Sequence, residues 1–210
     1  NITIPYKENF IGLCDKVTAR AKKIGSVNLT YKKNNLVYGD NTDVLGFDKT
    51  FNFLKIKNTR TVLMIGAGGA ARAILYYLNK KSIENIDIFA TSTKREKNLT
   101  ESFKFKNFLT KSSHLKKRYD LIINASSAGM SKDNKINRNI LYLVKKASGV
   151  IDIVYNPIET DLLKEAKKHN VKSSSGLKML VEQAKPSYER WCGNKIKIDN
   201  EIYQMLLRNI

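Results

Sequence analysis

A glycine-rich segment at residues 66–71 constrains the fold of this chain most, because of what lies on either side of it. The apolar, β-branched run TVLMI at residues 61–65 precedes the glycines, and the helical pattern RAILYYLN follows them. A short apolar run of this kind is typical of a buried parallel strand. The order strand, glycine turn, helix therefore predicts the opening of a βαβ unit.

Strand and helix patterns continue to alternate along the middle of the chain. Further strands are predicted at residues 86–89 (IDIF), 121–124 (LIIN), 150–154 (VIDIV) and 171–173, and helices at residues 70–79, 139–146 and 160–169. Such alternation is typical of α/β proteins with helices on both faces of a parallel sheet. We therefore predict a Rossmann-like, doubly wound parallel sheet.

The two ends of the chain do not continue this regular alternation of strands and helices. The first 54 residues contain the strand-like NITIP, helical stretches at 9–13 and 17–23, and a hairpin turn at Asn34 and Asn35, since Asn tolerates positive φ. Helical patterns at 177–191 and 200–208 close the chain. We expect a partial α/β domain at residues 1–54, the Rossmann domain at 55–176, and helices at 177–210 that return to the first domain.

Composition limits the classes of protein. The 210 residues are 42% apolar and 27% charged, with no apolar stretch of membrane-spanning length. Cys14 and Cys192 lack zinc-ligand spacing, and no signal peptide is recognisable, so we expect a soluble, cytoplasmic protein without metal. The net charge of +19 is spread in short groups without a nucleic-acid motif. We therefore expect no nucleic-acid or membrane partner, but a field that favours anionic small molecules.

The glycine segment satisfies the pattern G-x-G-x-x-[GA] between a strand and a helix. Its members are Gly66, Ala67, Gly68, Gly69, Ala70 and Ala71. Gly66 permits the tight turn, Gly68 lets backbone N–H groups approach a pyrophosphate, and Ala71 lets the helix pack closely on the strand. The pattern predicts a dinucleotide site, and the alternative is a tight turn without a ligand.

The end of the second strand distinguishes NAD from NADP. An acidic residue there would bind the ribose 2′-hydroxyl of NAD, but this chain has ATSTKR at residues 90–95. Lys94 and Arg95 are available for a 2′-phosphate, and the planar guanidinium of Arg95 suits it better. The local chemistry favours NADP, although Lys94 is also compatible with a solvated charge at the start of a helix.

Seven motifs stand out along the chain, namely NITIPYK (1–7), SVNL (26–29), GDNTDVLG (39–46), GAGGAARA (66–73), INASSAGM (123–130), DIVYNPIETDLL (152–163) and SGLKMLVEQA (175–184). In sequence and in order, these motifs resemble those of the shikimate dehydrogenases. The resemblance implies a reversible, NADPH-dependent reduction of 3-dehydroshikimate to shikimate, a step toward chorismate and the aromatic amino acids. Methylene-tetrahydrofolate dehydrogenases share the architecture, but their motifs around the catalytic lysine differ from NITIPYK and GDNTD.

The resemblance also implies roles for single residues. Lys7 and Asp43 match the catalytic pair, in which the ammonium donates a proton to the alkoxide that forms at C3 and the carboxylate positions it. Positions that line the substrate pocket in the family are Asn1, Thr3, Asn28, Tyr155 and Gln183. Ser126 and Met130, with Ala125, match the segment bordering the nicotinamide half of the cofactor, and Gly176 matches a glycine near its ring.

Three of these assignments have plain structural alternatives. Tyr155 is equally compatible with a core aromatic at the end of a strand. Gln183 could lie on an exposed polar helix face, and Gly176 could simply start a helix. Spacing alone decides none of the three.

The sequence departs from the family in two places. The usual N-R-T at the end of the second Rossmann strand is Thr91-Ser92-Thr93 here, which keeps an NAD-using quinate/shikimate dehydrogenase as an alternative. The strand and helix that carry a substrate-binding S-x-S pair in the family would precede Asn1, so we expect an incomplete substrate domain. A non-catalytic dinucleotide-binding module is a further alternative, and we expect a monomer or a homodimer.

Overall fold

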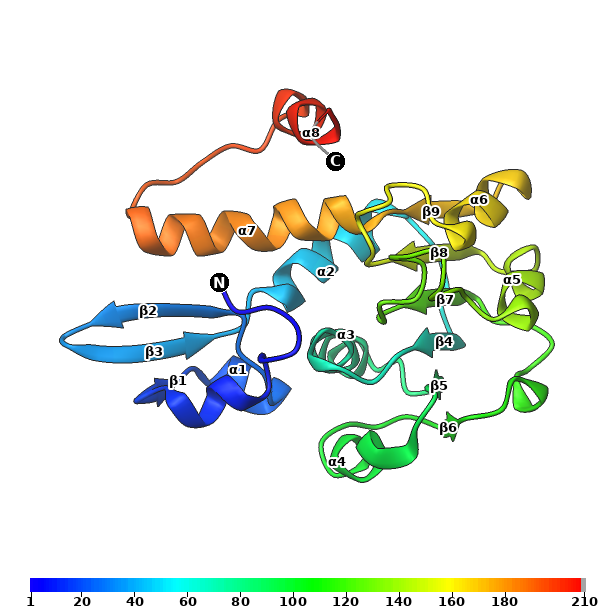
Figure 1. Ribbon diagram of the computed structural model, residues 1–210, viewed down its shortest axis with the longest axis horizontal. Coiled ribbons are helices and arrows are strands. Elements are labelled where there is room, and N and C mark those ends of the chain that lie inside the picture. Colours follow the sequence, from blue (N-terminus) through cyan, green and yellow to red (C-terminus); the bar gives the residue numbers. More distant parts are fainter. Residues whose placement is uncertain (209–210) are drawn as a thin grey trace.

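The computed structural model describes residues 1–208, which form two lobes joined by two helices (Figure 1). The first elements are η1 (Asn9–Leu13), β1 (Lys16–Val17), α1 (Ala19–Ile24), β2 (Leu29–Lys33), β3 (Leu36–Asp40) and α2 (Asp43–Phe53). Then come β4 (Val62–Ile65), α3 (Gly69–Lys80), β5 (Ile86–Phe89), η2 (Thr93–Arg95), α4 (Glu96–Thr100), β6 (Asn107–Leu109), η3 (Ser112–His114), β7 (Leu121–Asn124), α5 (Arg138–Val144), β8 (Gly149–Asp152), α6 (Asp161–Lys168) and β9 (Lys172–Ser174). The last helices are α7 (Gly176–Cys192) and α8 (Asn200–Leu207).

The larger lobe is built on a six-stranded sheet in the order β6-β5-β4-β7-β8-β9. Every strand pairs in parallel with its neighbours, so the predicted Rossmann-like class is confirmed. The five predicted strands are present, and β6 is an additional edge strand. The chain leaves β4 toward β5 on one side and returns to β7 on the other, which creates a topological switch point at the carboxyl ends of β4 and β7.

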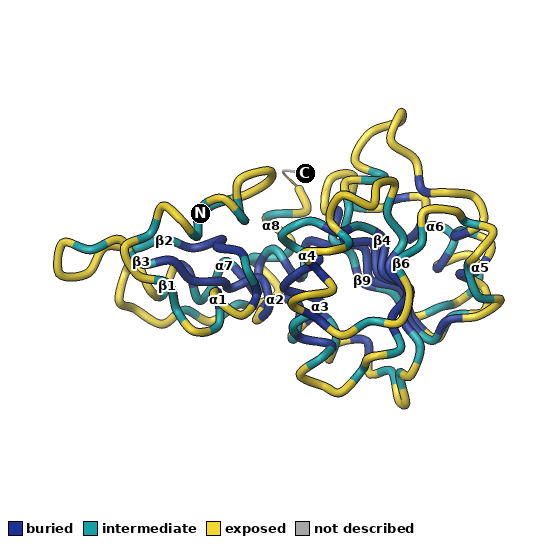
Figure 2. Tube along the Cα trace, turned by 90° about the horizontal axis from the view of Figure 1, so that it is seen from below, coloured by how far each residue is buried: buried dark blue, intermediate teal, exposed yellow. Residues whose placement is uncertain are grey.

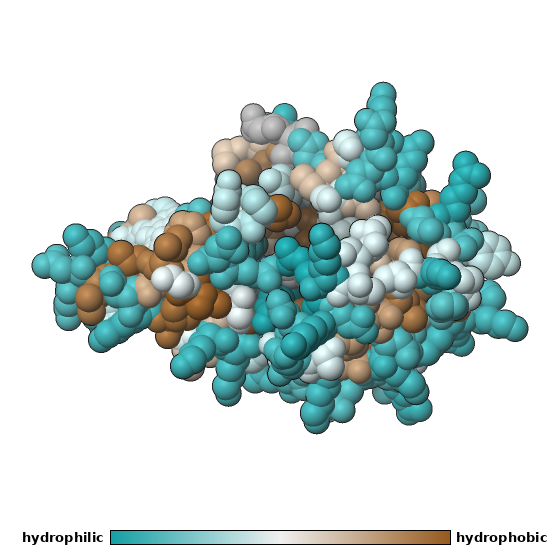
Figure 3. Space-filling model, turned by 60° about the horizontal axis from the view of Figure 1, so that its bottom comes forward, coloured by the Kyte–Doolittle hydropathy of each residue, from teal (hydrophilic) through white to brown (hydrophobic). Residues whose placement is uncertain are grey.

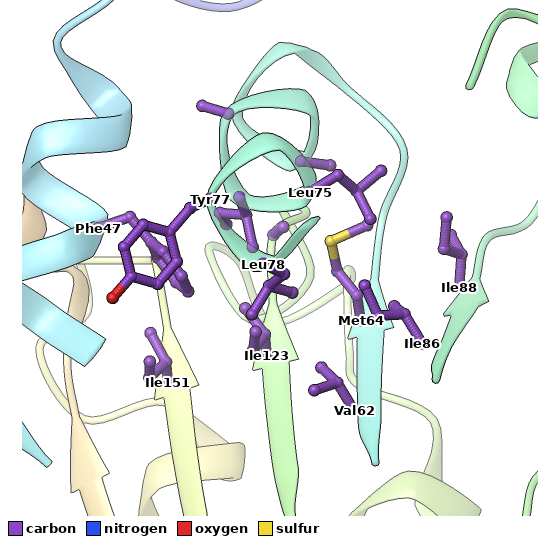
Figure 4. Close-up of a cluster of buried hydrophobic side chains, with 14 of the residues drawn as sticks. Phe47, Val62, Met64, Leu75, Tyr77, Leu78, Ile86, Ile88, Ile123 and Ile151 are labelled. Atoms are coloured by element: carbon purple, nitrogen blue, oxygen red, sulfur yellow. The ribbon is translucent and has the colours of Figure 1, made fainter. Parts of the chain in front are cut away.

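Both faces of this sheet are buried, because β4 is apolar at every position. Val62 and Met64 belong to one cluster of buried side chains, and Leu63 and Ile65 to a second cluster on the opposite face. Figure 4 shows the first cluster, in which side chains of α3 pack on the strands. Phe47 of α2 joins it, with its ring edge-on to Tyr77 at 5.3 Å between centroids. The core of the larger lobe therefore extends to α2.

The smaller lobe contains a three-stranded sheet in the order β1-β3-β2. The predicted hairpin is confirmed, since Asn34 and Asn35 link β2 to β3 with φ of 50° and 59°. The prediction of a strand at NITIP is wrong, because residues 1–3 are irregular and residues 4–8 form turns. Ile2 N–H donates to the Asn28 carbonyl at 2.8 Å, but this bond does not extend into a ladder.

The surface of the smaller lobe is partly apolar. The hairpin tip is exposed in Figure 2, whereas the strands of the larger sheet are buried. Ile4, Leu13 and Val37 are exposed, and Figure 3 shows apolar side chains gathered over this lobe, while hydrophilic side chains cover most of the other visible surface. No helix within residues 1–208 is long and apolar enough to cross a membrane.

Helices α2 and α7 join the lobes. A Cβ added at Gly46 of α2 would lie 2.6 Å from the carbonyl oxygen of Met179 in α7, so glycine permits this close approach. At its far end α7 reaches β2, where Trp191 donates to the Thr30 carbonyl at 2.9 Å. Helix α8 is linked to α7 by Tyr203, whose hydroxyl donates to Glu182 at 3.3 Å. The division of the chain into domains at residues 54 and 176 stays a prediction. Residues 209–210 of the predicted C-terminal part lie outside the described residues.

Candidate active site

Lys7 and Asp43 form a short ion pair. The Lys7 Nζ lies 2.6 Å from Asp43 Oδ2, and the two side chains are 14% and 5% exposed. Lys7 comes from the turns before η1, and Asp43 is the first residue of α2. The fold therefore places an ammonium and a carboxylate together at the boundary between the lobes.

Asn28 holds the other oxygen of Asp43. Its side-chain amide donates to Asp43 Oδ1 at 2.9 Å, to Thr42 Oγ1 at 2.9 Å and to Gln183 Oε1 at 3.1 Å. Gln183 is 9% exposed, so the alternative of an exposed polar face is wrong. One hydrogen-bonded cluster, called the polar floor below, thus contains Lys7, Asp43, Asn28 and Gln183. It is built from both ends of the chain.

Sequence reasoning missed two hydroxyls in this floor. The Thr42 hydroxyl lies 3.2 Å from that of Ser187, and its backbone N–H donates to Asn28 Oδ1 at 2.7 Å. Thr42 lies inside the GDNTD motif, and Ser187 lies four residues after Gln183 on α7. Helical spacing from Gln183 was the signal that could have found Ser187.

Asp40 fixes the turn that leads to Asp43. Arg20 donates to both of its carboxylate oxygens, at 3.1 and 2.6 Å, and Thr18 and the backbone N–H of Asn41 donate to Oδ1 at 2.7 Å. Burial alone would raise the pKa of Asp40, but these hydrogen bonds outweigh it and lower the pKa below its ordinary value. A charged, fully bonded carboxylate therefore anchors the start of α2.

Three predicted substrate residues lie outside this network. Asn1 and Thr3 are exposed, and Tyr155, in the segment after β8, is 40% exposed. The core-aromatic alternative for Tyr155 is therefore wrong. Within residues 1–208, none of these three side chains is hydrogen-bonded to the Lys7–Asp43 pair, so their predicted role is not expressed in a contact.

The glycine loop follows β4 and lies beside Lys7. Gly66 has φ of 100°, and a Cβ there would lie 2.9 Å from both the Ala125 carbonyl oxygen and the Ser126 Cβ. A Cβ at Gly69, the first residue of α3, would lie 3.0 Å from the Lys7 Cβ. At Gly68 it would meet nothing within 4 Å, so the backbone there is open to a ligand. The loop and the N-terminus of α3 fit a pyrophosphate.

Arg95 reaches back to the glycine loop. Its guanidinium donates to the Ala67 carbonyl at 3.4 Å and pairs with Glu8, the neighbour of Lys7 in the chain. Lys94 is exposed, and its backbone N–H donates to the Ser92 hydroxyl at 3.3 Å. The structure thus brings Arg95 to the loop and leaves Lys94 at the surface.

The remaining cofactor candidates follow β7 and β9. Ser126 donates to Asn124 Oδ1 at 2.7 Å, and Met130 is exposed. Gly176 starts α7, and a Cβ there would lie 2.0 Å from the Ile153 carbonyl oxygen. Gly176 therefore does start a helix, and its backbone also packs too closely on the end of β8 for a side chain.

These features together define a class. A doubly wound parallel sheet, an open glycine loop at the start of α3 and an adjoining Lys–Asp pair are the parts of a two-lobed, dinucleotide-binding α/β oxidoreductase.

Comparison with known proteins gives the particular family. The family described as "Shikimate dehydrogenase substrate binding domain" matches residues 1–30, and "Shikimate / quinate 5-dehydrogenase" matches residues 49–172. A shikimate dehydrogenase (NADP(+)) of Caldanaerobacter subterraneus subsp. tengcongensis is 38% identical over 200 residues, which cover 92% of this chain and 71% of the relative. One of Bacillus subtilis is 36% identical over 208 residues, covering 95% and 74%. The chain belongs to the shikimate dehydrogenase family.

Solved structures of shikimate dehydrogenases match the fold of this chain. A chorismate mutase/shikimate 5-dehydrogenase fusion protein from Clostridium acetobutylicum matches with a TM-score of 0.83 and 34% identity, covering all of this chain and 77% of that one. Shikimate 5-dehydrogenase from Thermus thermophilus, solved in complex with NADP(H) and shikimate, matches with a TM-score of 0.77 and 27% identity, covering 94% and 74%.

Proposed function

We propose that this protein catalyses the reversible, NADPH-dependent reduction of 3-dehydroshikimate to shikimate, with Lys7 as the acid/base. The observation that carries the proposal is the 2.6 Å pair of Lys7 and Asp43 beside the first residue of α3. Such a pair next to a dinucleotide is suited to proton transfer to and from the oxygen of a carbonyl whose carbon gains or loses a hydride. The choice of substrate rests on the names of the relatives, which are shikimate dehydrogenases.

The chemistry of the pair follows from its contacts. Bound NADPH would supply the hydride to the carbonyl carbon, and negative charge would then develop on the carbonyl oxygen. Lys7 Nζ stabilises that charge and donates a proton, while Asp43 Oδ2 keeps the ammonium aimed. The Asn28 amide fixes Asp43 Oδ1 and so prevents the carboxylate from turning. In the oxidation direction Lys7 accepts the proton from the hydroxyl.

The polar floor suits a substrate rich in hydroxyl groups. Gln183 Oε1 already accepts from Asn28 and from Thr42, and Gln183 Nε2 donates to the Leu180 carbonyl at 3.0 Å. One of the two N–H groups of Gln183 Nε2 is paired with Leu180, so the other is available to a substrate hydroxyl. An analogue that lacks this hydroxyl would leave the N–H unpaired and bind poorly. We assign Asn1, Thr3 and Tyr155 to the same pocket as further substrate contacts.

The cofactor contacts follow the glycine loop. We assign the pyrophosphate to the backbone of residues 66–71 and the N-terminus of α3, and the 2′-phosphate to Arg95 with Lys94 beside it. The nicotinamide half would lie against Ser126, Met130 and the backbone at Gly176. The net charge of +19 would attract both the anionic cofactor and an anionic substrate.

The test is turnover by the protein that carries this chain. Shikimate oxidation is followed by absorbance of the reduced nicotinamide, with NADP and NAD in parallel, and quinate as a second substrate. Lys7→Met is expected to lower kcat by about 100-fold or more, whereas Lys23→Met, an exposed lysine of α1, should not. Turnover of quinate with NAD would favour the alternative dehydrogenase, and tight NADP binding without turnover would leave a binding module.

Two further assignments belong to this proposal. We place the enzyme in the cytoplasm, where Cys14 and Cys192, both free thiols, would stay reduced. We also expect a monomer or a homodimer, which sedimentation equilibrium would distinguish.

A further inference from the structure

Asp152 is a fully buried carboxylate that the proposed chemistry does not use. It ends β8, and its Oδ1 accepts from the Asn124 amide at 2.9 Å and from the Val154 backbone N–H at 3.0 Å. Its Oδ2 accepts from the Thr160 hydroxyl at 2.6 Å. Within residues 1–208, Asp152 has no ion-pair partner. Burying such a group is costly, which suggests that its hydrogen bonds serve a purpose.

The first arm of this hydrogen-bond network connects Asp152 to the loop at residues 125–130, called the cofactor loop because Ser126 and Met130 are assigned to the cofactor. Asn124 is the register partner of Asp152 in the neighbouring strand β7. Its amide also donates to the Ala128 carbonyl at 2.8 Å, and its Oδ1 accepts from both the backbone N–H and the hydroxyl of Ser126. The loop after β7 is thus folded around Asn124, and Gly66 packs directly on Ser126.

The second arm runs to the segment after β8. Val154 N–H binds Asp152, while the Val154 carbonyl accepts from Gly176 N–H at 3.0 Å. Thr160, eight residues after Asp152, closes the segment that carries Tyr155. The two arms also meet, since a Cβ at Gly129 would lie 3.4 Å from the Cβ and Cγ2 of Thr160.

We propose that Asp152 is a positioning residue that sets the cofactor loop at 125–130 and the Tyr155 segment at 153–160 relative to one another. Only a side chain that accepts on both oxygens can hold donors from three directions at this point. The geometry of the loop beneath the nicotinamide half and the position of Tyr155 then depend on one buried group. This inference rests on the proposed function for its kinetic consequence but not for its structural one.

The kinetic test uses two substitutions and a matched control. Asp152→Ala removes every acceptor and is expected to lower kcat/KM by about 100-fold, because displacements near 1 Å have effects of that order. Asp152→Asn keeps one acceptor and should lose less. The control is Asp87→Asn, since Asp87 is also fully buried in the same sheet. It accepts from Asn107 and Tyr119 and pairs with Lys116 at 3.2 Å, and all three lie outside the proposed site.

The positioning role is judged by kcat/KM in the variants that remain folded. Loss of kcat/KM in both Asp152 variants, with an unchanged value in the folded Asp87→Asn control, supports the positioning role. Equal losses in the Asp87 and Asp152 variants, or a folded Asp152→Ala variant with full activity, would overturn it.

A second measurement separates this inference from the proposed function. Hydrogen exchange of backbone amides needs no substrate, and Asp152→Ala should speed exchange in residues 125–130 and 153–160 together, leaving α3 protected. If the wild-type protein turns over neither shikimate nor quinate but this paired change occurs, the proposed function fails and the positioning role stands. Unchanged exchange in either segment overturns the positioning role.

Discussion

Gly46 in α2 offers a sharp test of how the two lobes are joined. In Gly46→Ala the new Cβ would lie 2.6 Å from the Met179 carbonyl oxygen and 2.9 Å from the Gln183 Cβ. The nearest atom belongs to the backbone of α7, so no side-chain rotation relieves the contact. The two helices must separate by several tenths of an ångström, and α7 carries Gln183 with it.

The size of the effect follows from two opposing terms. Overpacking of this kind costs about 1–3 kcal/mol, and replacing glycine by alanine inside a helix returns up to about 1 kcal/mol. We expect the free energy of unfolding to fall by about 1–2 kcal/mol. Because Gln183 accepts from Asn28 at 3.1 Å, its displacement should also lower kcat/KM for shikimate by about 10-fold, somewhat less than a full 1 Å misplacement would.

The assay is urea unfolding followed by circular dichroism, together with steady-state kinetics. Gly12→Ala is the matched control, since a Cβ at Gly12 meets nothing within 4 Å. Wild-type stability and kcat/KM in Gly46→Ala would refute the reasoning that α2 and α7 are held at their closest approach.

Three further predictions concern the cofactor, the core and the buried carboxylate. Arg95→Ala should weaken NADP binding by about 10-fold or more and leave NAD binding unchanged in calorimetric titration, because a charged hydrogen bond contributes about 1.5–3 kcal/mol; equal losses for both would contradict the 2′-phosphate assignment. Phe47→Ala should lower the free energy of unfolding by about 3–5 kcal/mol in urea, since Phe47 is fully buried between α2 and α3, and a loss below about 1 kcal/mol would contradict this packing. Burial raises the pKa of Asp152 to about 6, against hydrogen bonds from Thr160, Val154 and Asn124 that lower it. The folded pKa thus exceeds the ordinary value of 3.8, so wild type loses stability relative to Asp152→Asn as the pH rises from about 4 to 7, and a stability difference independent of pH would argue against a buried, titrating carboxyl.

The fold was predictable where burial is uniform along an element. The run TVLMI could be recognised because every residue of β4 is buried, and the glycines after it marked the turn into α3. Strand β6 was missed because its three residues are exposed or half-buried and carry no apolar run. Helix α2 was missed because its apolar face has meaning only against α7, where Gly46 reads as a helix breaker until the partner helix is known.

The candidate site was predictable only in part. Nothing in the spacing of Lys7 and Asp43 indicates that residues 36 positions apart meet, and the resemblance to a family supplied that hypothesis. Ser187 escaped notice because a serine on a helix is ordinarily solvated. Asp152 escaped for the opposite reason, since a carboxylate at the end of a strand gives no sign in the sequence that its charge is buried.

The length and helical rotation of α7 set the distance and orientation between two parts of the site. It begins at Gly176 against the end of β8, carries Gln183 two turns later into the polar floor, and ends where Trp191 meets β2. One residue inserted between Gly176 and Gln183 would turn the glutamine by about 100° and advance it by about 1.5 Å. Related proteins should therefore vary in length in the segment between α7 and α8, while the seven-residue step from the glycine to the glutamine should tolerate neither insertion nor deletion.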